Sequence, residues 1–317
     1  MNVRRHHISA LALAAVTALG AGTLSACSSD SAAAGNTDKF DVVASFYPMA
    51  FLAEQIGGGH VNVSSLTEPG QEPHDLEIST QQRAQLEDAD AALFLKGLQP
   101  AVDEAVEQSG LDTKIDAATL TKLENHGDVE HEHEGEAHAE DEADALDPHI
   151  WLDPVKYAEV AKGVGAAFEK ADPDHAADYK KNTDALVKKL DGLNTQFKDG
   201  LGDTRTKVFF TNHAAFTYLA ERYGLTQEAI TGVDPDSEPS PARIKQLRDE
   251  AKADGVTTVF YETLVSDKTA KTLADDAGLK TDVLDPLEGI TGKSKGDDYF
   301  EVMESNLAAL KTALGAK

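Results

Sequence analysis

Residues 175–199 read HAADYKKNTDALVKKLDGLNTQFKD, and this stretch predicts one long helix near the middle of the chain. A helix of about 25 residues spans almost 40 Å at 1.5 Å per residue. Such a helix is long enough to join two separate lobes, and it would hold them more stiffly than flexible hinge strands. Its apolar residues recur mostly every three or four positions, with lysine and aspartate between them: Tyr179, Leu186, Leu190 and Leu193.

Short apolar runs and helical patterns alternate on both sides of this helix. We predict strands at 41–46, 61–66, 91–95, 207–211, 256–261 and 282–284, and helices at 48–56, 80–87, 214–223, 241–253 and 268–277. Because such alternation builds parallel sheets covered by helices, each side is expected to form its own lobe. The predicted fold class is α/β, with two lobes of mainly parallel sheet joined by a long rigid helix.

The first 30 residues predict export and lipidation. Two arginines, Arg4 and Arg5, precede an uncharged, mostly apolar run that is too short and too rich in alanine and glycine for a transmembrane helix. The run ends in LSAC at 24–27, which resembles the bacterial lipobox, where cleavage precedes a cysteine that receives diacylglycerol. Lipidated Cys27 would tether the chain to the outer face of the bacterial cytoplasmic membrane. Ordinary cleavage that leaves a free secreted chain is the alternative.

These features divide the chain into five predicted parts. They are a signal peptide at 1–26, the lipidated cysteine and a flexible leash at 27–39, the N-terminal lobe at 40–171, the linking helix at 172–203 and the C-terminal lobe at 204–317.

The composition excludes several function classes. The 317 residues include 29 Lys and Arg against 56 Asp and Glu, which gives a formal net charge of -27. Nucleic acid is an improbable partner because phosphate binding needs a basic surface. Cations are favoured as ligands instead. The single cysteine excludes an internal disulfide framework and a thiolate metal cluster.

The segment 124–147 differs from the rest of the chain in composition. It has eleven acids and no Lys or Arg, and its four histidines are His126, His131, His133 and His138. With almost no apolar residues it cannot pack, so we expect a loop within the N-terminal lobe. It is either a low-affinity zinc collector or sensor, or a solvated charge run with no role.

Four further residues are candidate metal ligands. They are His74 in GQEPHD at 70–75, His149 in DPHIWLDP at 147–154, His213 in FFTNHA at 209–214, and Asp285 in VLDPL at 283–287. Three of them follow predicted strands, where open α/β sheets form their ligand crevices. Three imidazoles and one carboxylate suit tetrahedral Zn²⁺, whereas Mn²⁺ favours more carboxylate oxygen. Spacing alone does not show that the four converge.

These segments, together with SFYP at 45–48, TNHAAF at 211–216 and GVDPDSEPS at 232–240, resemble the metal-specific solute-binding proteins of ABC importers, and the zinc branch in particular. The matching segments run from Phe40 almost to the end of the sequence. The resemblance implies two α/β lobes joined by one long helix, with the metal in the cleft between them. It implies His74 and His149 as ligands from the first lobe, and His213 and Asp285 from the second.

In that family the third ligand is histidine in zinc binders and glutamate in most manganese binders, so His213 points to zinc. The insert rich in histidine and acid just before the second ligand histidine is also a trait of the zinc branch. Some zinc members use a glutamate or a water as the fourth ligand, so Glu72 or water remains an alternative to Asp285.

The leading hypothesis is a monomeric, non-enzymatic lipoprotein that captures Zn²⁺ and delivers it to an ABC permease with its cytoplasmic ATPase. A manganese or iron importer component, or a metal-dependent adhesin on the same scaffold, is the alternative. A zinc hydrolase is less favoured, because a fourth protein ligand closes the position that an activated water needs. The sequence also lacks the His-Glu-x-x-His pattern of metalloproteases.

Overall fold

The computed structural model describes residues 39–126 and 146–317. The predicted signal peptide, Cys27 and the leash up to residue 38 lie outside the described residues, as do His131, His133 and His138. Within the described part of the chain, we find no helix with the length and apolar character needed to cross a membrane.

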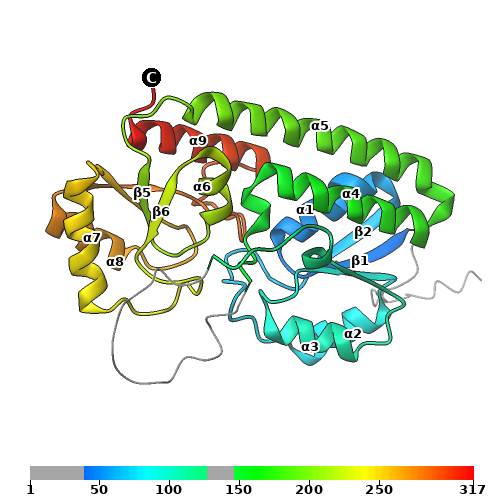
Figure 1. Ribbon diagram of the computed structural model, residues 1–317. Coiled ribbons are helices and arrows are strands. Elements are labelled where there is room, and N and C mark those ends of the chain that lie inside the picture. The colour runs from blue at the N-terminus through cyan, green and yellow to red at the C-terminus, as the bar shows by residue number, and fades with distance from the viewer. Residues whose placement is uncertain (1–38, 127–145) are drawn as a thin grey trace, which may run out of the picture. The chain divides into compact units, whose positions relative to one another are not determined.

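The N-terminal lobe is a four-stranded parallel sheet with helices between its strands (Figure 1). In chain order its elements are β1 (Phe40–Ala44), α1 (Tyr47–Gly57), β2 (Val61–Ser65), α2 (Thr80–Asp88), β3 (Ala91–Phe94), α3 (Pro100–Gln108) and β4 (Thr113–Asp116). The strands are ordered β2-β1-β3-β4 across the sheet, and every pair is parallel. The apolar β3, which reads AALF, is buried along its whole length because strands and helices surround it.

The C-terminal lobe repeats this arrangement. Its elements are β5 (Val208–Thr211), α6 (Thr217–Tyr223), β6 (Thr226–Ala229), α7 (Pro241–Ala253), β7 (Thr258–Tyr261), α8 (Lys268–Ala277), β8 (Lys280–Val283) and α9 (Tyr299–Leu314). The strand order is β6-β5-β7-β8, again parallel throughout. In each lobe the first strand (β1 or β5) lies between the second and the third, and the fourth strand lies beyond the third. Both sheets therefore have the same topology.

The helices α4 (Pro154–Ala171) and α5 (Ala176–Leu201) connect the two sheets. Asp153 caps α4 by accepting a hydrogen bond from the backbone N–H of Val155, and Pro154 occupies the first turn, where its missing N–H costs nothing. Helix α5 packs against α1 and α4 from the first lobe and against α9 from the second (Figure 1). Its 26 residues bury an apolar stripe that includes all four positions predicted from the spacing: Tyr179, Leu186, Leu190 and Leu193.

The predicted fold class is confirmed: two parallel α/β lobes are joined by a long helix. Each of the six predicted strands overlaps a strand of the structure. Two further strands, β4 and β6, escaped prediction because their sequences, TKID and TQEA, are polar and only partly buried.

Candidate metal centre

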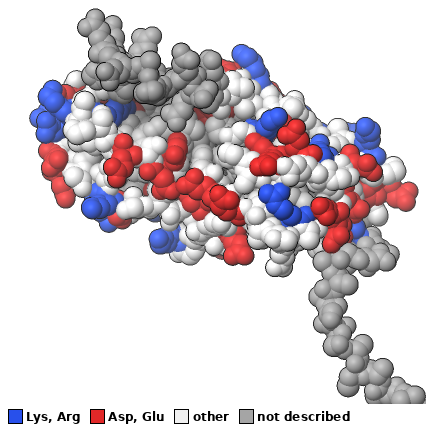
Figure 2. Space-filling model, turned by 90° about the horizontal axis from the view of Figure 1, so that it is seen from below, with Lys and Arg blue, Asp and Glu red and all other residues white. Residues whose placement is uncertain are grey.

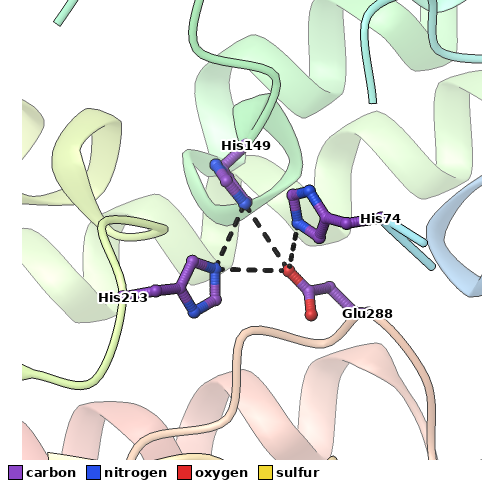
Figure 3. A group of neighbouring side chains, drawn as sticks. All are labelled: His74, His149, His213 and Glu288. Carbon is purple, nitrogen blue, oxygen red and sulfur yellow. Dashed lines mark hydrogen bonds and ion pairs between the residues drawn. The ribbon is translucent and has the colours of Figure 1, made fainter. Parts of the chain in front are cut away.

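Three histidines and one glutamate converge where the two lobes meet. Figure 3 shows His74, His149, His213 and Glu288 pointing toward one another. Glu288 Oε1 lies 3.3 Å from His74 Nε2 and 3.5 Å from the Nε2 atoms of both His149 and His213. The Nε2 atoms of His149 and His213 are 3.4 Å apart. Ligand atoms bound at about 2.0–2.1 Å around a tetrahedral Zn²⁺ lie about 3.4 Å from one another, so these spacings match such a site.

Each of the four side chains is placed by a connection between regular elements. His74 lies between β2 and α2, and His149 directly precedes the 3₁₀ turn Ile150–Leu152. His213 follows β5, and Glu288 follows β8. Three of the four thus come from segments that follow a strand, the part of an open parallel sheet where ligand sites form.

Asp285, expected from the sequence as the fourth ligand, lies outside this group, and Glu288 occupies the position beside the three histidines. Its Oδ1 accepts a hydrogen bond from the Leu287 backbone N–H at 2.9 Å, and its Oδ2 accepts one from Thr263 Oγ1 at 3.2 Å. Asn306 holds the backbone of Asp285 on both sides, accepting from its N–H at 2.9 Å and donating to its carbonyl at 2.7 Å. The carboxylate of Asp285 therefore fixes the turn that carries Glu288.

The turn between Asp285 and Glu288 contains an unusual backbone conformation. Leu287 has φ of 59°, in the left-handed region that residues other than glycine rarely occupy. The side chain of Leu287 is fully buried, and its N–H is bonded to Asp285, so packing and hydrogen bonding offset a cost of about 1–2 kcal/mol. This conformation redirects the chain just before Glu288.

Glu72, the other protein candidate for the fourth ligand, lies in a different group, with Asp75 and Asp236. Burial raises the pKa of Glu72 to about 7, although the nearby His74 acts in the opposite direction. A carboxyl group that is partly protonated at neutral pH is a weaker metal ligand than Glu288, whose pKa is held well below the usual range.

Two buried carboxylates orient two of the histidines. Asp147 Oδ1 lies 2.8 Å from His149 Nδ1 and also accepts the His149 backbone N–H at 2.9 Å. Glu262 Oε1 lies 2.6 Å from His213 Nδ1. A carboxylate at Nδ1 keeps the proton there, which leaves the Nε2 lone pair directed into the group. Asp147 was part of a motif noted in the sequence, whereas nothing in the sequence marked Glu262.

Carboxylates and imidazoles in this group shift one another's pKa. Burial alone would lower the pKa of His149 and His213, but their carboxylate partners raise it, and for His213 it is well above the usual value. Burial would raise the pKa of Glu288, but hydrogen bonds from the three histidines hold it well below its usual range. Without metal, protons therefore stabilise this cluster of histidines and carboxylates.

Removing the negative charge behind His213 tests this orientation. In Glu262→Gln we expect zinc affinity to fall about 10-fold, because the neutral amide polarises the imidazole less and no longer fixes its tautomer. Competition with a chromophoric chelator measures the change. Glu87→Gln, which alters an exposed carboxylate on α2, is the matched control. Equal affinities in the two variants would show that Glu262 has no part in metal binding.

Trp151 ties the segment of His149 to the segment of Glu288. Its indole N–H donates to the carbonyl of Pro286 at 2.7 Å, and its own carbonyl accepts from the hydroxyl of Tyr299 at 2.7 Å. Asp153, two residues on, accepts hydrogen bonds from the guanidinium of Arg222 on α6, the shortest at 2.7 Å. These hydrogen bonds thus fix the chain around His149 to the C-terminal lobe.

The sequence GKSKG at 292–296 matches the Gly-x-Ser-x-Gly pattern of a nucleophile elbow. In the structure it lies within the connection between β8 and α9, with neither a strand directly before it nor a helix directly after it. It therefore lacks the strand-turn-helix context that gives that pattern its meaning.

Two parallel α/β lobes, a long connecting helix and a buried group of three histidines and a glutamate together define the class of metal-specific solute-binding proteins. Within that class, residues 42–313 match the family described as zinc-uptake complex component A, periplasmic, and the chain belongs to this family. The family is a solute-binding component of an uptake system.

Relatives and solved structures agree with this placement. The chain is 35% identical over 298 residues to the zinc-binding lipoprotein AdcA of Streptococcus pneumoniae, covering 91% of this chain and 58% of that protein. It is 35% identical over 286 residues to the high-affinity zinc uptake system protein ZnuA of Bacillus subtilis, covering 88% and 89%. The Zn(II)-bound ZnuA-like domain of Streptococcus pneumoniae AdcA superposes with a TM-score of 0.72 at 33% identity, covering 87% of this chain and 99% of that domain. The chain thus spans somewhat more than half of the AdcA proteins.

Proposed function

We propose that this chain captures Zn²⁺ outside the cytoplasmic membrane and delivers it to the permease and ATPase of an ABC importer. The zinc ligands in this proposal are His74, His149, His213 and Glu288. The observation that carries it is the distance of 3.3–3.5 Å from Glu288 Oε1 to each of three imidazole nitrogens. The zinc named in the relatives AdcA and ZnuA supports the same cargo.

The ligand set favours zinc over manganese. Three imidazole nitrogens and one carboxylate oxygen suit a small borderline cation in tetrahedral geometry, whereas Mn²⁺ prefers six ligands that are mostly oxygen. Glu288 Oε2 is buried and has no hydrogen-bond partner among the described residues. A buried carboxylate oxygen is costly to leave unpaired, and a bound cation offsets that cost.

Charge balance also supports a divalent cargo. With neutral imidazoles, the ligand Glu288 and the two supporting carboxylates, Asp147 and Glu262, carry three negative charges against the two positive charges of Zn²⁺. The surface adds a long-range attraction: Figure 2 shows acidic side chains running across one face of the described chain, with basic side chains scattered around them. Such a potential raises the local concentration of cations without selecting among them.

Capture and release need an opening on the ligand group. The side chains of His149, His213 and Glu288 are completely buried, whereas that of His74 is 12% exposed. Neither Asp147 nor Glu262, which support the other two histidines, is bonded to His74 in the structure. We therefore assign the entry and exit of the ion to the His74 side.

The proposal includes a lipid anchor at Cys27 and a monomeric chain. Anchoring would keep the captured ion near the permease, because the mature chain then diffuses only over the membrane surface. A zinc hydrolase fits the site less well, because Glu288 fills the fourth position that an activated water would need.

The test combines binding and uptake. The metal-free chain titrated with Zn²⁺ and with Mn²⁺ in calorimetry is expected to bind one tight equivalent of zinc and to bind manganese far more weakly. Cells that lack the gene should accumulate radioactive zinc slowly at scarce zinc, and the intact gene should restore uptake. Equal affinity for both metals would reassign the cargo. Tight zinc binding with unchanged uptake would separate this chain from transport.

A further inference from the structure

Helix α6 contacts both ends of the short segment that carries His149. Tyr218 and Arg222 lie four positions apart on α6, so their side chains project from one face of the helix. The Tyr218 hydroxyl donates to the carbonyl of Asp147 at 2.9 Å, two residues before His149. The Arg222 guanidinium donates to the carboxylate of Asp153, four residues after His149, at distances down to 2.7 Å. One turn of α6 therefore holds the segment on both sides of its histidine.

We propose that Tyr218 and Arg222 act as a clamp, a pair of positioning residues that hold His149 in place for zinc and thereby slow the release of the ion. Both residues lie outside the group of four ligands, so they act on the metal through His149. This inference rests on the zinc site of the proposed function. It adds two residues of α6 to the parts of the chain that set zinc affinity.

The helix of the clamp begins close behind another proposed ligand. His213 follows β5, and α6 starts at Thr217, four residues farther along. The Nε2 atoms of His213 and His149 are 3.4 Å apart. Because α6 continues the chain from one of these histidines and holds the segment of the other, it fixes the two imidazoles relative to one another. Binding sites need their ligand atoms held to within about 0.5 Å, and the clamp supplies that constraint.

Tyr218 is itself held firmly, which makes it a rigid end of the clamp. Its side chain is buried, and its hydroxyl also accepts the backbone N–H of Glu124 at 2.7 Å. The ring of His126 packs edge-to-face on the Tyr218 ring with centroids 4.3 Å apart, and Lys156 Nζ lies 4.7 Å from the ring centre. The backbone N–H of Asp147 donates to the carbonyl of Glu124 at 3.0 Å. The hydroxyl is therefore aimed at one carbonyl.

Arg222 forms the other end of the clamp. Its Nε donates to both carboxylate oxygens of Asp153, at 3.1 and 2.9 Å, and its Nη2 donates to Oδ2 at 2.7 Å. Such forked pairs of arginine and carboxylate fix direction as well as distance. Asp153 is buried and also accepts the backbone N–H of Val155 at the start of α4. Arg222 therefore ties the segment of His149 to α6 at the point where α4 begins.

Asp147 transmits the position of Tyr218 to the imidazole of His149. Its backbone carbonyl accepts from Tyr218, and its side-chain Oδ1 lies 2.8 Å from His149 Nδ1. The other carboxylate oxygen, Oδ2, lies 2.7 Å from His126 Nδ1, so the carboxylate cannot rotate freely. A shift of the Asp147 backbone therefore moves the imidazole as well. Loss of the Tyr218 hydroxyl should leave all four ligands present but hold one of them less firmly.

The test measures zinc release from the full zinc-loaded chain by stopped flow, with a chromophoric chelator in excess. Tyr218→Phe removes only the hydroxyl, and we expect release to be about 10-fold faster than in the wild type. Tyr223→Phe is the matched control, because Tyr223 lies on the same helix but its hydroxyl donates to Asn194 on α5 at 3.1 Å. Arg222→Lys keeps the charge and loses the fork, so its release should also be faster.

A double-mutant cycle separates positioning from a general loss of stability. Tyr218→Phe should lower zinc affinity in the wild-type chain and leave it unchanged in His149→Ala, because the clamp acts through His149. Equal release rates in Tyr218→Phe and Tyr223→Phe would overturn the clamp. An effect of Tyr218→Phe that persists in full in His149→Ala would overturn it too. If His149→Ala itself binds zinc as tightly as the wild type, the proposed zinc site fails, and the clamp fails with it.

Discussion

His213→Ala is expected to weaken zinc binding roughly 100-fold or more while the fold persists. Four-ligand structural zinc sites have apparent binding free energies of about 10–16 kcal/mol, so one ligand of four accounts for about 3 kcal/mol. His213 also carries the contact to Glu262, which is left buried without its imidazole partner in the variant. Calorimetry with a competing chelator measures the affinity, and circular dichroism checks the fold.

His60→Ala is the matched control for this variant. His60 is also a histidine near a strand, but it stacks on His175 and lies 2.9 Å from Asp178, outside the ligand group. We expect its zinc affinity to equal that of the wild type. If His213→Ala binds zinc as tightly as His60→Ala does, His213 is not a ligand.

Zinc affinity is expected to depend steeply on pH. The pKa of His149 and of His213 is raised in the metal-free chain, because Asp147, Glu262 and Glu288 outweigh burial. Zinc must displace these protons, and each displaced proton changes the affinity by up to about tenfold per pH unit. Where both histidines are protonated, affinity should fall about 100-fold per unit of acidification. Calorimetry in buffers of different ionisation enthalpy counts the protons released, and a count of zero at neutral pH would contradict the raised pKa values.

Zinc affinity should rise with pH, whereas the part of the metal-free chain's stability that comes from His149 and His213 should fall as the pH rises. A histidine whose pKa is raised by folding contributes stability that is complete below its unfolded value of about 6.5 and is lost as the pH rises through the folded value. Glu288, whose pKa is lowered, contributes above about 4.5 and loses that contribution on further acidification. The increase in Tm on adding zinc should therefore grow from about pH 5.5 to pH 8, because zinc replaces the lost protons.

Three of the four ligands proposed here could be found from the sequence, because the residues around each of them carry recognisable signals. His74, His149 and His213 stand beside strands or helix starts, in segments that resemble a known family. Asp285 showed the same signals, since it follows a strand and precedes a proline. Glu288 lies three residues farther along, beyond Leu287 at φ of 59°. A left-handed leucine is not foreseeable from composition or spacing, so the sequence could not show which carboxylate reaches the histidines.

The fold could be predicted where an element is buried on one or both faces, because its apolar residues then follow a recognisable pattern in the sequence. The stripe on α5 and the apolar strands β1, β3, β5 and β7 are examples, since these strands lie inside their sheets. Strands β4 and β6 read TKID and TQEA and are only partly buried, so they lack that pattern. Their place at a sheet edge is not the whole reason, because the edge strands β2 and β8 were predicted. The sequence did not indicate that Glu262 contacts His213, because a single buried carboxylate leaves no repeating pattern of residues.

Anomalous diffraction at the zinc edge, from crystals of the zinc-loaded chain, tests the proposed site most directly. We predict one strong peak at about 2.0–2.2 Å from the Nε2 atoms of His74, His149 and His213 and from a carboxylate oxygen of Glu288. Asp285 should remain bonded to Leu287 and Thr263. A peak coordinated by Asp285 or Glu72, with Glu288 turned away, would contradict the account.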